Sequence, residues 1–148
     1  MILVKFVRLK KVREDNDNTQ QEIADILKVK RGTYASWECG TDTMPLAKIF
    51  EYALFYSKSI DYIVELSNRN LELSFNKKNI NLTFVGKKLK EVRNMSELSQ
   101  AKFAESIGIN QSTWWAYENG KTLITTSSLI TLAKKYKVSI DWILGVSD

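Results

Sequence analysis

The chain repeats itself at an offset of 80 residues, and this repeat constrains its fold more than any other feature. Residues 9–63 align without a gap with residues 89–143, and 15 of these 55 positions are identical. The identical pairs include Leu9/Leu89, Arg13/Arg93, Gln20/Gln100, Ala24/Ala104, Thr33/Thr113, Glu38/Glu118, Gly40/Gly120, Tyr56/Tyr136 and Asp61/Asp141. A fixed internal period sets the architecture before any local pattern does. We therefore expect the same small module twice in the 148 residues.

Composition excludes several classes of protein. The chain has no histidine, which rules out Ser-His, Cys-His and zinc-His hydrolytic sites. Its one cysteine cannot form an internal disulfide, which favours a reducing, cytoplasmic compartment. No apolar run reaches the ~20 residues of a membrane span. Met1–Leu9 lacks the long apolar core of a signal peptide. We expect no membrane partner.

Charge is distributed unevenly between the two copies. The formal net charge is +5, with ten cations and ten anions in residues 1–66 but nine cations and six anions in residues 82–148. A basic balance suits a polyanionic partner such as nucleic acid. A solvated basic surface would explain the same excess, so charge alone does not decide.

Helical spacing and caps predict five helices in each copy. In the second copy, we expect helices over Phe84–Asn94, from Ser99 to Gly108, and then over Gln111–Glu118, Thr126–Tyr136 and Ile140–Leu144. The first copy has the same pattern, with a capping box at Thr19–Glu22 and Lys28 in place of the glycine. The predicted organisation is a first domain over 1–66, a connector over 67–82 and a second domain over 83–148.

The motifs resemble one known family. The second copy contains Ser99-Gln100, Phe103-Ala104, Ile107-Gly108-Ile109, Tyr117-Glu-Asn-Gly-Lys121 and Ser139-Ile-Asp-Trp-Ile-Leu144, and the first copy matches in Gln20, Ile23-Ala24, Thr33, Trp37-Glu38 and Ser59–Ile63. This pattern resembles the Cro/xenobiotic-response-element family of phage-repressor-type helix-turn-helix domains. The resemblance implies an all-α fold of two tandem five-helix, lambda-repressor-like domains.

Two opposite charges recur at one spacing. Arg13 and Glu38 are 25 residues apart, as are Arg93 and Glu118. The repeated spacing predicts an ion pair between the first and third helices of each module. The family has such a pair in a structural role, which we favour over a catalytic or ligand role.

Polar residues at the start of the second helix and around the third predict phosphate contacts. Helix N-termini attract anions, and the resemblance implies that Gln20 and Gln100 meet a DNA phosphate. An ordinary polar first-turn residue is the other interpretation. The set predicted to contact phosphate consists of Gln20, Lys30, Gln100, Asn119, Lys121 and Thr122.

The third helix should enter the major groove. In the second copy Gln111, Ser112, Trp115 and Ala116 should face outward, while Trp114 and Tyr117 face the core. Glutamine can bind adenine with two hydrogen bonds. Trp115 is open to a DNA contact or a protein contact. In the first copy, Arg31 and Ser36 are the candidate base-reading residues, and this copy looks like the weaker reader.

The connector has two interpretations. Leu71–Phe75 and Ile80–Phe84 alternate apolar and polar residues around Asn76-Lys-Lys-Asn79, which favours a β-hairpin. An extended linker is the alternative.

These patterns lead to one expected function and one alternative. We expect sequence-specific binding of double-stranded DNA by a bacterial or phage-encoded, nucleoid-associated transcriptional regulator. The alternative is a protein–protein interaction module on the same fold, resembling an antitoxin or antirepressor. We expect no enzymatic activity, because no predicted helix presents a plausible catalytic cluster. We also expect no cofactor, metal or small-molecule site, and a homodimer remains open.

Overall fold

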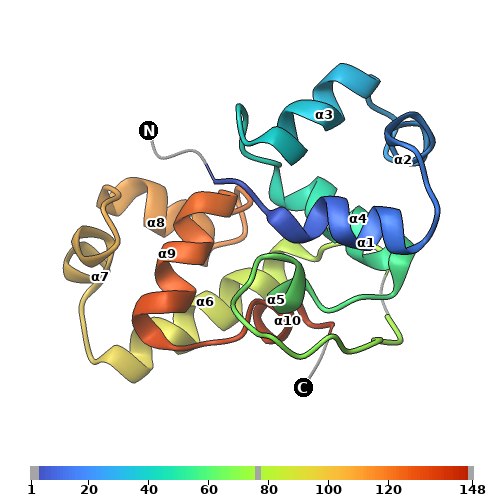
Figure 1. The fold of residues 1–148 in the computed structure, drawn as a ribbon. Coiled ribbons are helices and arrows are strands. Elements are labelled where there is room, and N and C mark those ends of the chain that lie inside the picture. The colour runs from blue at the N-terminus through green and yellow to red at the C-terminus, as the bar shows by residue number, and fades with distance from the viewer. Residues whose placement is uncertain (1–3, 76–77, 147–148) are drawn as a thin grey trace. The chain divides into compact units, whose positions relative to one another are not determined.

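A computed structural model describes residues 4–75 and 78–146. The chain divides into two compact units, residues 1–73 and 74–148. Each described unit consists of five helices joined by short turns (Figure 1). The predicted all-α fold of two tandem five-helix domains is confirmed. None of the described helices is long and apolar enough to cross a membrane.

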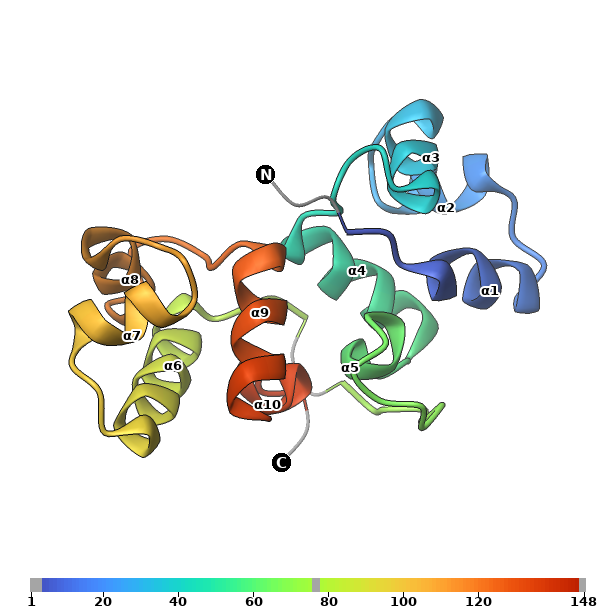
Figure 2. The same cartoon turned by 60° about the vertical axis from the view of Figure 1, so that its left-hand side comes forward.

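Unit 1 contains two short helices, joined by a tight turn, of which the second packs on the first helix of the unit. Its helices are α1 (Val7–Asp15), α2 (Gln20–Ile26), α3 (Arg31–Cys39), α4 (Leu46–Tyr56) and α5 (Ile60–Ile63). Helices α2 and α3 contact each other closely, and α1 contacts both α3 and α5 (Figure 2). Thr19 and Glu22 form the predicted capping box at the start of α2.

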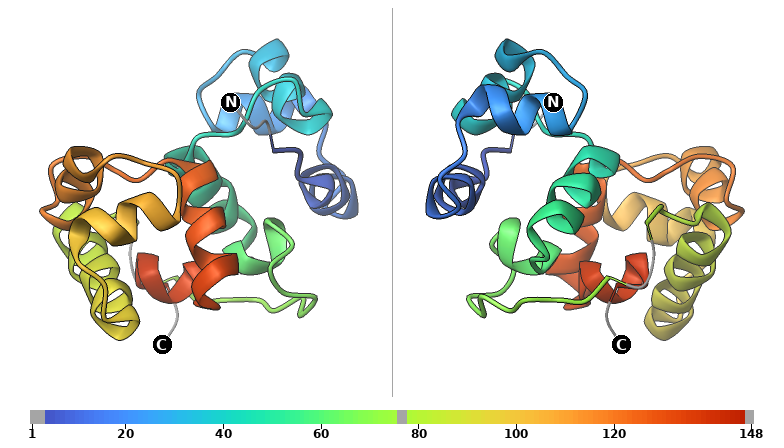
Figure 3. Two further views of the ribbon diagram at one scale, coloured as in Figure 1. Left: turned by 90° about the vertical axis from the view of Figure 1, so that its left-hand side faces the viewer. Right: turned by 90° about the vertical axis from the view of Figure 1, so that its right-hand side faces the viewer.

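Unit 2 repeats this arrangement. Its helices are α6 (Leu82–Ser96), α7 (Gln100–Ser106), α8 (Gln111–Glu118), α9 (Thr126–Tyr136) and α10 (Ile140–Leu144). The bounds of α8, α9 and α10 agree with those predicted. Helix α8 packs against α6 and α7, and α10 packs against α6 and α9 (Figure 3). Ser99 and Ser139 cap α7 and α10 through their hydroxyl oxygens.

The cores of the two units are built from corresponding positions. Leucines at 9 and 89 and isoleucines at 63 and 143 are all fully buried. The largest buried rings also correspond, since Tyr34 and Trp114 are both 0% exposed. Matching burial at an offset of 80 explains why the repeat retains apolar residues at these positions, where each large side chain contributes about 1.5–3 kcal/mol by leaving water.

The first helix begins at different positions in the two units. A Cβ atom on Gly86 of α6 would lie 2.5 Å from the carbonyl oxygen of Glu118, so only glycine lets α6 pass this close to the end of α8. The corresponding residue in unit 1 is Phe6, which is buried. Helix α1 starts only at Val7, and residues 4–6 have no regular secondary structure.

Of the two interpretations of the connector, the β-hairpin is wrong in its second strand. Leu82 begins α6, and the side chain of Asn81 accepts a hydrogen bond from the Phe84 backbone N–H. This cap satisfies a backbone donor that a lone strand would leave unpaired. The first segment pairs elsewhere, through a single antiparallel bridge between Glu72 and Lys58. The predicted turn over 76–79 begins with two residues, 76–77, that lie outside the described part of the chain.

Residues 67–73 are bound to unit 1 by several hydrogen bonds. The Arg8 guanidinium donates to the carbonyl oxygens of Tyr62 and Ser67, at 2.6 and 2.5 Å. It also lies over the ring of Tyr62, 4.2 Å from the centroid. The Leu73 backbone N–H donates to the Ser57 carbonyl at 2.8 Å. This part of the predicted connector is therefore folded onto unit 1.

Candidate nucleic-acid interface

The turn between α7 and α8 holds the third helix of unit 2 through a side-chain cap. The Asn110 side-chain oxygen accepts hydrogen bonds from the Thr113 backbone N–H and from the Ser112 hydroxyl, both at 2.8 Å. Gly108 ends the preceding helix in a left-handed conformation, with φ +76°, as its predicted role at a helix C-terminus requires. The start of α8 is thus held by short contacts within the turn.

The outer face of α8 presents the residues predicted to read bases. Gln111 and Ser112 are exposed, Trp115 is 47% exposed and Ala116 is half-buried. Trp114 and Tyr117 are buried, as predicted. The Gln111 amide makes no hydrogen bond within the described residues, whereas the Ser112 hydrogen is donated to the cap. Gln111 is therefore the residue on this face best able to bind a base edge.

A partly buried ion pair stands behind this face. Arg93 donates to Glu118 through Nε at 2.5 Å and Nη2 at 3.1 Å. Glu118 also accepts from the Gln100 amide at 3.3 Å and from the Trp114 indole N–H. Burial raises the pKa of the Glu118 carboxyl, but these hydrogen bonds outweigh burial, so its pKa is lowered. The carboxylate thus ties α6, α7 and α8 together.

The turn after α8 exposes a cation. Lys121 and Thr122 are exposed, and the Lys121 ammonium makes no hydrogen bond within the described residues. The Asn119 amide donates to the Trp115 carbonyl at 2.9 Å, which closes the helix end. Their predicted phosphate contacts remain predictions, and Lys121 is the most available of the three.

Unit 1 has the same ion pair, with its glutamine engaged in the same way. Arg13 donates to Glu38 through Nε at 2.7 Å and Nη2 at 3.0 Å. The Gln20 amide donates to the same carboxylate at 3.1 Å and accepts from Arg31 at 3.2 Å. The side chains of Gln20 and Gln100 are therefore committed to glutamates, a role that sequence reasoning missed. Their phosphate role remains a prediction.

The third helix of unit 1 lacks long, free side chains on its outer face. Lys30 precedes α3 without a side-chain cap. The Ser36 hydroxyl donates to the Thr33 carbonyl at 2.6 Å, and Arg31 is bonded to Gln20. Base contacts by Arg31 and Ser36 remain predictions, but both side chains are already engaged within the unit.

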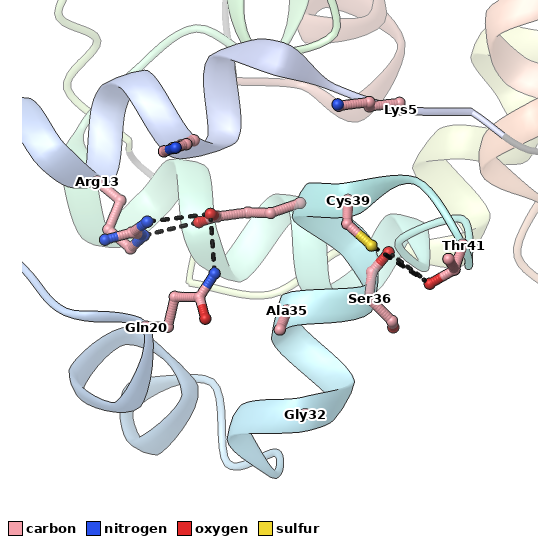
Figure 4. A pocket seen from close by; sticks show the side chains of 10 residues that line it. Lys5, Arg13, Gln20, Gly32, Ala35, Ser36, Cys39 and Thr41 are labelled. Carbon is pink, nitrogen blue, oxygen red and sulfur yellow. Dashed lines mark hydrogen bonds and ion pairs between the residues drawn. The ribbon is translucent and has the colours of Figure 1, made fainter.

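A pocket of about 660 Å³ lies on this face of unit 1. It is lined by Lys5, Lys10, Arg13, Gln20, Gly32, Ala35, Ser36, Glu38, Cys39 and Thr41. Figure 4 shows α3 beside Lys5 from the segment before α1, Arg13 from α1 and Gln20 from α2. Sequence reasoning missed Lys5 and Lys10 as candidates. The sequence did contain one indication of the pocket itself, because the small Ala35 stands where the second copy has the large Trp115.

Two family models match the chain in tandem. A model described as "Helix-turn-helix" matches residues 9–63, and one described as "Helix-turn-helix domain" matches residues 86–147. The first match contains α2, α3 and the Arg13–Glu38 ion pair. The second contains α7, α8 and the Arg93–Glu118 ion pair. No solved structure matches the chain significantly.

Two curated proteins are similar to part of the chain. An uncharacterized HTH-type transcriptional regulator, YobD of Bacillus subtilis (strain 168), is 36% identical over 61 residues, which is 41% of this chain and 54% of that protein. Antitoxin PezA of Streptococcus pneumoniae serotype 4 is 33% identical over 61 residues, which is 41% of this chain and 39% of that protein. The chain thus spans about half, or less, of the length of these relatives.

Proposed function

Because the chain carries two tandem helix-turn-helix domains of the Cro/xenobiotic-response-element type, we propose that it binds double-stranded DNA sequence-specifically as a transcriptional regulator. The observation that carries this proposal is the outer face of α8. A free glutamine amide and an exposed indole stand there on a helix held by a partly buried ion pair. Rigid presentation of this kind suits readout in the major groove.

Unit 2 would supply the base contacts through Gln111. We expect Gln111→Ala to cost about 1–3 kcal/mol of binding free energy on the best site and to relax the preference at one base pair. Enrichment of random-sequence duplex DNA, done in parallel with the wild type and the variant, measures both effects. Gln21→Ala is the matched control, because this exposed glutamine is bonded to Asp25 instead. An enriched motif that Gln111→Ala leaves unchanged would exclude this role.

Phosphate contacts would make binding strongly dependent on salt. We expect Lys121→Ala and Lys30→Ala each to lower the slope of log affinity against log salt by about 0.9, equally for all sequences, since each lysine releases a counterion. Titrations at several salt concentrations measure this slope. If Lys30→Ala leaves the salt slope unchanged, Lys30 does not contact a DNA phosphate.

A second candidate function is protein–protein interaction on the same fold. It is favoured by the exposed Trp115 and by the similarity to a protein named an antitoxin. The enrichment experiment separates the two candidates: wild-type protein that binds no duplex DNA at low salt would exclude the regulator and leave the interaction module.

A further inference from the structure

The two units present different surfaces at corresponding positions of their third helices. Ser112 and Trp115 of α8 correspond to Gly32 and Ala35 of α3 at the offset of 80. Two small residues thus replace a hydroxyl and an indole. The pocket of about 660 Å³ opens on this part of α3. Unit 1 therefore has a pocket at the positions where unit 2 carries the exposed side chains of Ser112 and Trp115.

The lining of this pocket is positively charged. Three cations, Lys5, Lys10 and Arg13, line it together with one carboxylate, Glu38, which leaves a net charge of +2. Arg13 and Glu38 neutralise each other in the ion pair. Lys5 and Lys10 are exposed and make no hydrogen bond or ion pair within the described residues. The two lysines supply the free charge of the site.

Lys5 reaches the pocket because of the way the chain enters unit 1. The segment before α1 is held by a hydrogen bond from the Val4 backbone N–H to the Thr43 hydroxyl oxygen, at 3.0 Å. A Cβ atom on Gly40 would lie 2.8 Å from Lys5 Cβ, so the lysine stem packs on the end of α3. In unit 2 the corresponding residue is Val85, which is buried in α6. The cation is thus specific to unit 1.

We infer that this pocket binds the phosphate backbone of DNA and that unit 1 holds the duplex without reading its sequence. Lysine is a compact point charge that suits phosphate, and phosphate contacts fix register but carry no sequence information directly. Base readout then comes from unit 2 alone, and Arg31 and Ser36 keep the internal hydrogen bonds that they have. This inference rests on the proposed function and assigns a separate task to each unit.

The test compares three variants of the full chain by salt titration and by enrichment of random duplex DNA. We expect Lys5→Ala with Lys10→Ala to lower the log–log salt slope by about 1.8 and to leave the enriched motif unchanged. Lys11→Ala is the matched control: it removes the next cation on α1, which is paired with Asp15 and does not line the pocket. Its slope should stay that of the wild type. Ala35→Trp should fill the pocket and weaken binding to all sequences by the same factor.

Each outcome separates this inference from the proposed function. If the wild type binds duplex DNA and the salt slope of the double lysine variant is unchanged, the inference that the pocket binds phosphate is overturned and the proposed function is not. A drop in slope of about 0.9 for Lys11→Ala, the same per lysine as in the double variant, would show a general charge effect and would also overturn the inference. A motif altered by the double lysine variant would show that unit 1 reads bases. Wild-type protein that binds no duplex DNA would instead remove the proposed function itself.

Discussion

Glu118→Ala is expected to destabilise unit 2 by about 3–5 kcal/mol, because it leaves a partly buried guanidinium without its carboxylate. The Glu118 side chain is 3% exposed and that of Arg93 is 16% exposed. After the substitution, the Arg93 guanidinium would keep, among the described residues, only its hydrogen bond to the Leu98 carbonyl, at 3.2 Å. The Trp114 indole N–H would also lose its acceptor. Since small domains are stable by only about 5–15 kcal/mol, this loss should remove a large part of the stability of unit 2.

Urea unfolding of the full chain, followed by tryptophan fluorescence, measures this effect. Asp15→Ala is the control, because it breaks the Lys11–Asp15 pair, whose side chains are both 56% exposed. Solvent screens such a pair, so the urea midpoint of Asp15→Ala should not differ measurably from that of the wild type. Combining Glu118→Gln with Arg93→Met should recover part of the stability, since no unpaired charge remains. A Glu118→Ala midpoint equal to that of the wild type would show that the pair does not support the fold.

The same pairs predict a direction of pH dependence. The pKa values of Glu38 and Glu118 are lowered from 4.5 in the folded chain, because the hydrogen bonds they accept outweigh the effect of burial. The unfolded chain therefore binds more protons in the acid range, and stability rises with pH there. The contribution of both pairs is present above about pH 4.5 and is lost as the pH falls through the folded values. Urea unfolding midpoints measured between pH 3 and 7 should depend less on pH when both glutamates are replaced by glutamine.

The sequence specified helices well wherever a local cap marks their ends. Asn110 and Asn119 cap the two ends of α8, and Ser139 caps the start of α10, each through contacts within four residues. Local contacts of this kind are readable from spacing alone. The ion pairs were equally readable, because the spacing of 25 residues recurs in both copies.

Long-range packing set what the sequence did not reveal. The alternation of residues 80–84 favoured a strand, but it is too short to outweigh the helix cap supplied by Asn81. Lys5 lies outside a helix beside the buried Phe6, whereas α6 has Gly86 at the position of Phe6, and only the packed structure displays this difference. The engagement of Gln20 by Glu38 left a signal that was missed, because Gln100 and Glu118 repeat the spacing of 18 residues.

The largest expected effect on binding concerns the symmetry of the DNA site. Family members commonly place two identical modules on two half-sites, whereas the third helices of this chain differ at Arg31/Gln111, Gly32/Ser112 and Ala35/Trp115. A single bound chain should therefore specify one half-site strongly and the other weakly. Scrambling the strong half-site should lower affinity by roughly 10³ or more, toward non-specific binding. Scrambling the weak one should change affinity little, because phosphate contacts ignore sequence.

Base-by-base substitution of the enriched site measures this asymmetry, and sedimentation with and without DNA gives the number of chains bound. One chain on an asymmetric site is the expected result. Two chains on a palindrome would instead mean that unit 2 reads both half-sites as a homodimer, in which case scrambling either half would cost the same. The Gln111→Ala variant distinguishes these cases again, since it should relax one half-site for a single chain and both half-sites for a dimer. A palindromic result would overturn the single-chain site while leaving DNA binding by unit 2 intact.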